Sequence, residues 1–155
     1  EKTLKQLKIT MIHDIKSHIS RLRSSGLRPT KQRVMICKVL FDRKDTFHFT
    51  IDNLKKKIDK TTKSKISLAT IYNTVHAFKN NGYLKEISLK GNKTFFDTNS
   101  TSHHHFYDHD SGSLIDIKNE EISFSKLPSV PKGKKIKSVE VTVSVANSSH
   151  NQKKN

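Results

Sequence analysis

The sequence has very little cysteine, with Cys37 the only one among 155 residues. A single thiol excludes an intrachain disulfide, and it also excludes a structural zinc site made from several cysteines. Cys37 falls on an apolar position of a helical pattern, which favours a small buried hydrophobic residue. This sparing use of cysteine predicts an intracellular, cytoplasmic protein.

Long hydrophobic runs are missing as well. No stretch stays apolar over the length that a membrane span needs, and the sequence carries no signal-peptide pattern. No single basic amphipathic helix dominates the chain either. We therefore expect no membrane partner.

Acidic residues are scarce relative to basic ones. The chain has 14 Asp and Glu against 30 Lys and Arg, which gives a formal net charge of +16. Such an excess repels itself within a compact fold unless a polyanion neutralises it, and nucleic acid is the common polyanion. The alternative explanation is a general preference for lysine and asparagine, because the lysines are spread along the whole chain.

The segment from Ser67 to Leu84 carries the clearest local signals. Ser67 is suited to cap the start of a helix, and Gly82 is suited to the left-handed position that ends one. Apolar residues recur between them at helical spacing, namely Leu68, Ile71, Val75 and Phe78. The opposite face is small and uncharged, with Ala69, Thr70, Asn73, Ala77 and Asn80. Because base edges are read by short hydrogen-bonding side chains, this segment is predicted to be a DNA recognition helix.

Three further helices are predicted before it. The first ends near Gly26 and has an apolar repeat at Leu4, Leu7, Met11, Ile15, Ile19 and Leu22. Thr30 is the predicted N-cap of the second helix, whose inward residues are Val34, Cys37, Leu40 and Phe41. Thr50 caps a third, with Ile51, Leu54 and Ile58 inward, and a polar linker from Asp59 to Lys65 follows.

A hairpin is predicted after the recognition helix. Leu84–Leu89 and Lys93–Asp97 flank Gly91-Asn92, a dipeptide that supplies the positive φ angles of a tight turn. Helices followed by a basic hairpin describe a winged helix-turn-helix. Lys90 and Lys93 lie at the tip of this wing, where they either contact a minor groove or phosphate backbone or simply keep a turn soluble.

The composition changes from Ser100 onward, which indicates a second domain. Leu114–Ile117 is predicted to be a strand, Lys126–Gly133 a loop, and Val139–Val145 a strand with strict alternation. This region has too few apolar residues to bury two sheet faces within one subunit, so we expect its strands to pair or pack across a dimer. The predicted fold class is α/β (α+β), with a DNA-binding domain over residues 1–99, a dimerisation and sensing domain over 100–146, and a flexible tail over 147–155.

Histidines are concentrated at the start of this second region. In an extended segment His103 and His105 point to one face and His104 to the other. Imidazole is a good ligand for zinc, manganese or iron, and carboxylates complete such sites where thiols are lacking. The nearby side chains that qualify are His109, Asp108, Asp110 and Asp116. A run of three histidines can also be an unstructured linker, and His48 can equally be a packing residue beside two phenylalanines.

Four motifs in fixed order carry a family resemblance, namely Gly26–Arg33, Ser67–Phe78, Gly91–Asn99 and His103–Phe106. Together they resemble the ferric uptake regulator family, and within it the iron response regulator (Irr) branch. The match runs from Leu22 to Val145, nearly the whole chain. The resemblance implies an N-terminal winged-helix domain, a C-terminal α/β dimerisation domain, and a homodimer that binds double-stranded DNA at an AT-rich inverted repeat.

The resemblance also implies roles for single residues. Tyr72 matches a recognition-helix tyrosine that packs on thymine methyl groups, while Thr70 and Asn73 would face bases or phosphates beside it. Lys31 and Arg33 match a basic helix start that approaches the DNA backbone. The candidate DNA-binding residues are Lys31, Arg33, Ser67, Thr70, Tyr72, Asn73, Lys90 and Lys93.

For the metal site, His48 matches a family histidine that reaches the interdomain site from just before the third helix. The run His103–His105 matches the family histidine cluster, which in the Irr branch is implicated in haem or metal binding. We therefore expect a divalent metal (zinc, manganese or iron), haem, or both as cofactor. The candidate metal ligands are His48, His103, His104, His105 and Asp116.

The chain departs from the family at one expected ligand. The family typically places a glutamate just before the glycine of the wing turn, whereas this chain has Lys90, whose ammonium would repel a divalent cation. Whether another carboxylate takes that place is left open by the sequence.

The function predicted is that of a regulator controlling iron, haem or oxidative-stress genes in response to metal or haem. A non-switching architectural nucleic-acid-binding protein is the alternative, and it would leave the histidines without a role. A metal-dependent hydrolase is disfavoured, because no HExxH spacing or acid–base pair accompanies the histidines. We therefore predict that the protein is not an enzyme.

Overall fold

The computed structural model describes the backbone of residues 4–148 and the side chains of residues 14–148. The chain forms two compact units that divide between Ser100 and Thr101. Most of the predicted tail, residues 149–155, lies outside the described residues. Within the described part, the helices are all too short or too polar to cross a membrane.

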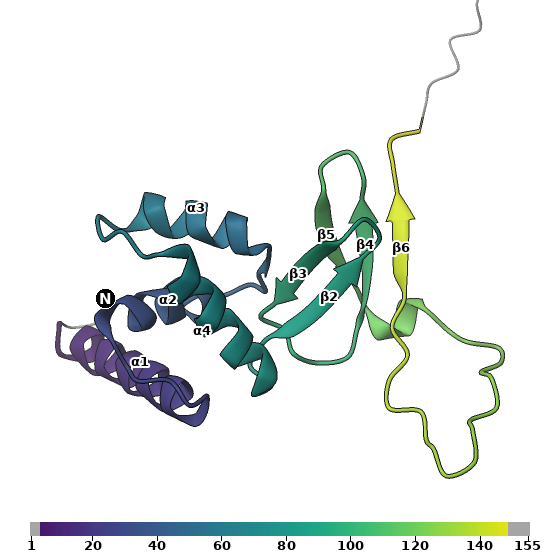
Figure 1. Ribbon diagram of the computed structural model, residues 1–155, viewed down its shortest axis with the longest axis horizontal. Coiled ribbons are helices and arrows are strands. Elements are labelled where there is room, and N and C mark those ends of the chain that lie inside the picture. Colours follow the sequence, from purple (N-terminus) through teal and green to yellow (C-terminus); the bar gives the residue numbers. More distant parts are fainter. Residues whose placement is uncertain (1–3, 149–155) are drawn as a thin grey trace, which may run out of the picture. The chain divides into compact units, whose positions relative to one another are not determined.

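The first unit begins with the four predicted helices (Figure 1). Their bounds are α1 Leu4–Ser24, α2 Lys31–Phe41, α3 Ile51–Thr61 and α4 Leu68–Asn80. The predicted caps are present, because Thr30, Thr50 and Ser67 each accept the backbone N–H three residues on, at 3.2, 3.2 and 3.1 Å. Gly82 follows α4 with a φ of 77°, the left-handed conformation expected there.

The core of this unit lies among α2, α3 and α4 and is closed by Leu22 of α1. Along α4 the buried residues are Ile71, Thr74, Val75 and Phe78. The prediction that Leu68 points inward was wrong, since 49% of its surface is exposed. Leu68 is the first residue of α4 and lies outside the part of the helix that packs against the core. Thr74 is buried instead, and its hydroxyl donates to the carbonyl oxygen of Thr70 at 2.7 Å.

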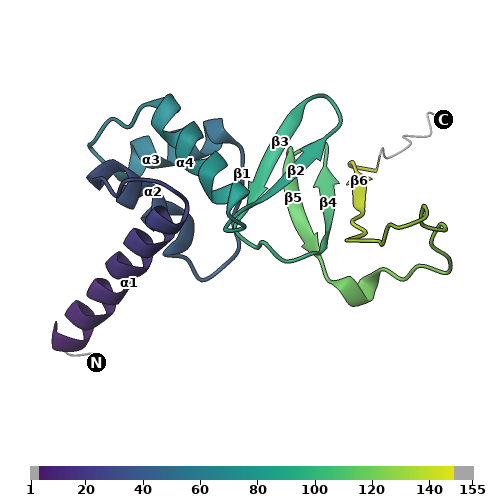
Figure 2. The same cartoon turned by 60° about the horizontal axis from the view of Figure 1, so that its bottom comes forward.

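A small antiparallel sheet completes the first unit (Figure 2). Its strands are β1 His48–Phe49, β2 Lys85–Leu89 and β3 Lys93–Asp97, in the order β1-β3-β2. The predicted wing is the β2–β3 hairpin, in which Leu89 pairs with Lys93 around the turn. Gly91 and Asn92 have φ values of 81° and 59°, so both adopt the positive φ that the turn requires.

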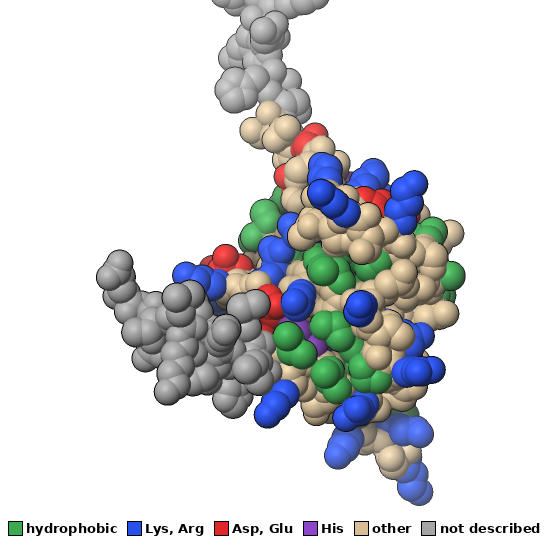
Figure 3. Space-filling view, turned by 90° about the vertical axis from the view of Figure 1, so that its left-hand side faces the viewer, with side chains coloured by type: hydrophobic (Ala, Val, Ile, Leu, Met, Phe, Trp, Pro, Cys, Tyr) green, Lys and Arg blue, Asp and Glu red, His purple; other side chains and the backbone are tan. Residues whose placement is uncertain are grey.

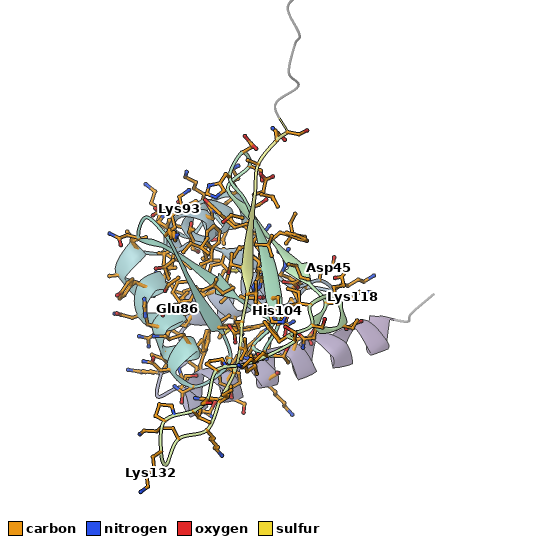
Figure 4. All side chains as sticks on the ribbon, turned by 90° about the vertical axis from the view of Figure 1, so that its right-hand side faces the viewer. Asp45, Glu86, Lys93, His104, Lys118 and Lys132 are labelled. Atoms are coloured by element: carbon orange, nitrogen blue, oxygen red, sulfur yellow. The ribbon has the colours of Figure 1, made fainter. Side chains whose placement is uncertain are left out.

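The second unit is a three-stranded sheet with a long connection. Its strands are β4 His104–Asp108, β5 Ser113–Ile117 and β6 Thr142–Val145, in the order β5-β4-β6, with a 3₁₀ turn η1 at Asn119–Glu121. The predicted strand over Val139–Val145 is shorter than expected, because β4 offers partners only from His105 to Asp108. Mostly exposed chain without regular secondary structure fills residues 122–141, and Figure 4 shows Lys132 at the tip of this segment.

Candidate functional sites

Two imidazoles and a carboxylate converge in the second unit. His103 precedes β4 and His105 lies within it, so the two side chains point to the same face. Their Nε2 atoms lie 3.1 and 3.3 Å from the same oxygen, Oδ1 of Asp116. Asp116 is directly opposite His105 in the β4–β5 ladder. Both histidines are buried, whereas 35% of the Asp116 side chain is exposed.

A backbone contact orients the ring of His103. Its Nδ1 lies 2.8 Å from the carbonyl oxygen of Thr101, which can only accept a hydrogen bond. A proton on Nδ1 leaves the Nε2 lone pair of a neutral ring directed towards Asp116. In a metal-binding histidine, the ring nitrogen that does not bind the metal usually donates a hydrogen bond to a carbonyl, a carboxylate or water. Two imidazoles and one carboxylate supply nitrogen and oxygen donors that fit zinc, manganese or ferrous iron.

His104 has a different environment on the other face of β4. Its Nδ1 accepts the backbone N–H of Val141 at 2.9 Å, and its ring meets Phe124 edge-on with centroids 6.0 Å apart. These contacts join β4 to the segment that leads into β6. The structure therefore does not bring His104 together with His103 and His105, although the sequence grouped all three as candidate ligands.

The first unit has its own histidine and carboxylate. His48 pairs with Asp97 in the β1–β3 ladder, and Nε2 of His48 lies 3.0 Å from Oδ2 of Asp97. Asp97 is fully buried, and its Oδ1 accepts the backbone N–H of Asn99 at 2.8 Å. A buried carboxylate beside an imidazole is a second donor pair suited to a metal ion.

Asp97 was not among the metal ligands predicted from the sequence. The family resemblance places a carboxylate before the wing turn, where this chain has the exposed Lys90, whereas Asp97 lies at the other end of β3. The available signal was an acidic residue directly after the apolar pair Phe95-Phe96, because an unpaired acid at such a position is costly to bury. Only the pairing of β1 with β3 connects that acid to His48.

The candidate DNA-reading residues lie on the exposed side of α4. Tyr72 is 52% exposed, and Asn73 beside it is exposed as well. Thr70 is half-buried, and its hydroxyl shares a 2.9 Å hydrogen bond with that of Ser67. Ser67 also caps the helix, so part of its hydrogen-bonding capacity is used within the protein. The ring of Tyr72 and the amide of Asn73 are therefore better placed to contact a partner than the hydroxyls of Thr70 and Ser67.

Basic side chains lie at the start of α2 and at the wing turn. Lys31 is exposed at the start of α2, while Arg33 donates from Nη1 to the carbonyl oxygen of Arg28 at 3.0 Å. Lys90 and Lys93 are both exposed at the wing turn, and Figure 4 labels Lys93 there. The face in Figure 3 has many Lys and Arg side chains and few Asp or Glu. Such a surface attracts a polyanion.

Comparisons with known proteins give a consistent picture. The model of the ferric uptake regulator family matches residues 24–145. The peroxide-responsive repressor PerR of Staphylococcus aureus (strain Mu50) is 30% identical over 111 residues, which span 72% of this chain and 73% of PerR.

Solved structures agree with the fold. The ferric uptake regulator of Vibrio cholerae superposes with a TM-score of 0.62 at 19% identity, covering 83% of this chain and 98% of that one. The ferric uptake regulator from Pseudomonas aeruginosa with manganese gives a TM-score of 0.60 at 20% identity, covering 84% and 97%. These likenesses confirm the predicted fold class, a winged helix followed by a small α/β domain.

Proposed function

Because this chain belongs to the ferric uptake regulator family, we propose that it is a metal-responsive transcriptional regulator that binds double-stranded DNA as a homodimer. It acts as a regulator in the cytoplasm and not as an enzyme. Residues 1–99 form the DNA-binding domain, and residues 100–146 form the dimerisation and sensing domain. Its targets are genes for iron or oxidative stress.

The exposed face of α4 supports the DNA-binding part of the proposal. Tyr72, Thr70 and Asn73 lie on the side of the helix that the core leaves uncovered, and they are short or aromatic instead of charged. Side chains of this kind reach base edges and thymine methyl groups in the major groove. Ser67 and the basic groups of Lys31, Arg33, Lys90 and Lys93 would contact phosphates and fix the register.

The shared oxygen of Asp116 is the single observation that carries the metal response. Two buried imidazole nitrogens lie within 3.3 Å of one carboxylate oxygen, which is the separation that nitrogen and oxygen ligands have around a single divalent ion. We assign the metal to His103, His105 and Asp116, and we propose His48 and Asp97 as further metal-binding residues. A divalent ion supplies concentrated positive charge to these donors.

A haem response is the less favoured form of the proposal. The Irr resemblance suggested haem at the histidine run, with His104 among its ligands. The three donors at Asp116 have the composition of a site for a small hard or borderline cation. We therefore propose that zinc, manganese or iron is the effector, and haem titration in the same assay tests the alternative.

Metal controls DNA binding only if it has a different affinity for the DNA-competent and the DNA-incompetent state. The coupling is then reciprocal, so DNA must raise or lower metal affinity by the same factor. A regulator therefore differs measurably from an architectural protein, for which DNA affinity is independent of metal.

The test is a binding titration of the full chain on an AT-rich inverted repeat and on a random duplex of equal length. It is run with EDTA, and with manganese, zinc or ferrous iron under anaerobic conditions. We expect preference for the inverted repeat and a metal-dependent change in affinity that His103→Ala with His105→Ala abolishes. His109→Ala is the matched control, because His109 is exposed beyond the end of β4.

Equal binding to both duplexes would remove the regulator proposal. Preference for the inverted repeat without any effect of metal would instead support the architectural alternative. Loss of metal response in His48→Ala or Asp97→Ala would support their assignment as metal-binding residues, and an unchanged metal affinity in both variants would contradict it.

A further inference from the structure

The ring of His76 stacks on the ring of Tyr72. Their centroids are 4.0 Å apart and their planes are inclined by 37°. The two residues are four positions apart on α4, so they lie on one face of the helix in successive turns. Tyr72 is 52% exposed and His76 is half-buried. The imidazole therefore covers one side of a phenol ring that otherwise faces solvent.

His76 is held in turn by the wing strand β3. Its ring meets that of Phe96 edge-on, with centroids 5.5 Å apart and planes at 82°. Phe96 is buried, pairs with Phe49 across the β1–β3 ladder, and stacks on its ring at 5.7 Å. The position of His76 is thus fixed by the core of the first unit and not only by its own helix.

We propose that His76 is a positioning residue that holds the ring of Tyr72 in the orientation that DNA reading requires. This inference rests on the proposed role of Tyr72 in reading DNA. An exposed side chain loses rotamer freedom when an interface orders it, and this loss weakens binding. A tyrosine that is already stacked loses less, so His76 strengthens binding at the base that Tyr72 contacts.

The same contact ties the recognition helix to the wing. Phe96 belongs to the strand that also carries Lys93 at the hairpin turn. His76 therefore links the helix proposed to read bases to the strand that leads to the wing turn. A side chain acting in this way affects sequence discrimination, whereas general attraction to DNA depends on the lysines.

The test compares His76→Ala, His76→Phe and His76→Leu in the full chain on the inverted repeat and on random duplex. His76→Ala should lower affinity for the inverted repeat by about two- to tenfold, which is the effect expected when the stabilisation from one aromatic pair is lost. Affinity for random duplex should stay unchanged. His76→Phe should restore binding, because it keeps an aromatic face, and His76→Leu should not, because it only fills the space. Asn53→Ala, an exposed position of α3 outside the proposed reading face, is the matched control.

Two further measurements separate this inference from its premise. In the Tyr72→Ala background, His76→Ala should cause no additional loss of affinity, since the two residues act as a unit. In the free protein, the ring-current shifts of the His76 ring protons should change in Tyr72→Ala, because only the contribution of the nearby Phe96 ring remains. Equal losses on both duplexes, full binding by His76→Leu, or additive losses would overturn the inference. Failure of the wild-type chain to prefer the inverted repeat would overturn the proposed function, while intact ring-current shifts would still establish the stack.

Discussion

His105 and Asp116 face each other across the β4–β5 ladder, with Nε2 of His105 lying 3.3 Å from Oδ1 of Asp116. The ladder fixes this distance, because residues directly opposite in antiparallel strands keep their side chains together on one face. A donor pair held by a sheet needs little rearrangement when an ion binds. The same carboxylate oxygen also serves His103 at 3.1 Å.

Asp116→Asn should weaken metal binding by at least about tenfold, because the substitution removes the negative charge shared by both imidazoles. Competition against a fluorescent chelator measures the affinity of the purified chain for manganese and zinc. Asp45→Asn is the control, since Asp45 is an exposed acid in the first unit. An equal loss in both variants would point to a general charge effect instead of a ligand.

Lys93→Ala should reduce the salt dependence of DNA binding without changing sequence preference. One lost phosphate contact lowers the slope of log K against log salt by about 1. The slope is measured between low and high salt on both the inverted repeat and a random duplex. Lys132→Ala, in the irregular segment of the second unit, should leave the slope unchanged. A loss of affinity confined to the inverted repeat would contradict a pure phosphate contact.

Leu68→Ala and Ile71→Ala should differ sharply in their effect on stability, although both residues belong to one predicted apolar stripe. Ile71 is fully buried, so its truncation should cost about 2–5 kcal/mol of the free energy of unfolding. Leu68 is 49% exposed. Its truncation should change stability by less than about 0.5 kcal/mol. Urea unfolding followed by circular dichroism gives both values, and comparable losses would place Leu68 in the core after all.

Cys37 should be unreactive in the native protein. Desolvation by burial raises the pKa of its thiol to about 12 and outweighs the opposing effect of the Arg21 charge. Ellman's reagent at pH 8 should label the chain only after unfolding in guanidinium chloride. Rapid labelling of the folded chain would show that α2 opens readily.

The raised pKa also predicts an alkaline dependence of stability. The unfolded thiol loses its proton near pH 9.0, while the folded thiol keeps it up to about pH 12. The unfolded state therefore binds fewer protons in this window, so the stability that the neutral thiol contributes falls as pH rises. The difference in unfolding free energy between the wild type and Cys37→Ala should shrink from pH 9 upward, and a constant difference would contradict it.

The helices of the first unit were predictable because their signals are local. Thr30, Thr50 and Ser67 each combine a capping side chain with an apolar repeat that begins within the following turn. The hairpin was equally local, since Gly91 and Asn92 supply its turn directly. Periodicity did not reveal where the core ends along α4, and for that reason Leu68 was misplaced while Thr74 was overlooked.

The features that could not be predicted from the sequence depend on pairing between residues that are far apart along the chain. The alternation of His103 and His105 followed from the two-residue period of a strand, and Asp116 was a candidate by proximity. By contrast, the contact between Asp97 and His48 depends on the register of β1 against β3, which no local pattern encodes. The length of β6 likewise depends on how much of β4 is available to pair with it.

The parallel pairing of β6 with β4 has a consequence for how the second unit assembles. β5 follows β4 through a short turn, whereas Val141 and its partner His104 are separated by 37 residues. Closing so long a loop costs more chain entropy than closing a hairpin, so we expect β6 to dock after the β4–β5 hairpin has formed. The two histidines and Asp116 belong to that early hairpin and its leading residue. The pairing that brings these three candidate donors together is therefore made without β6.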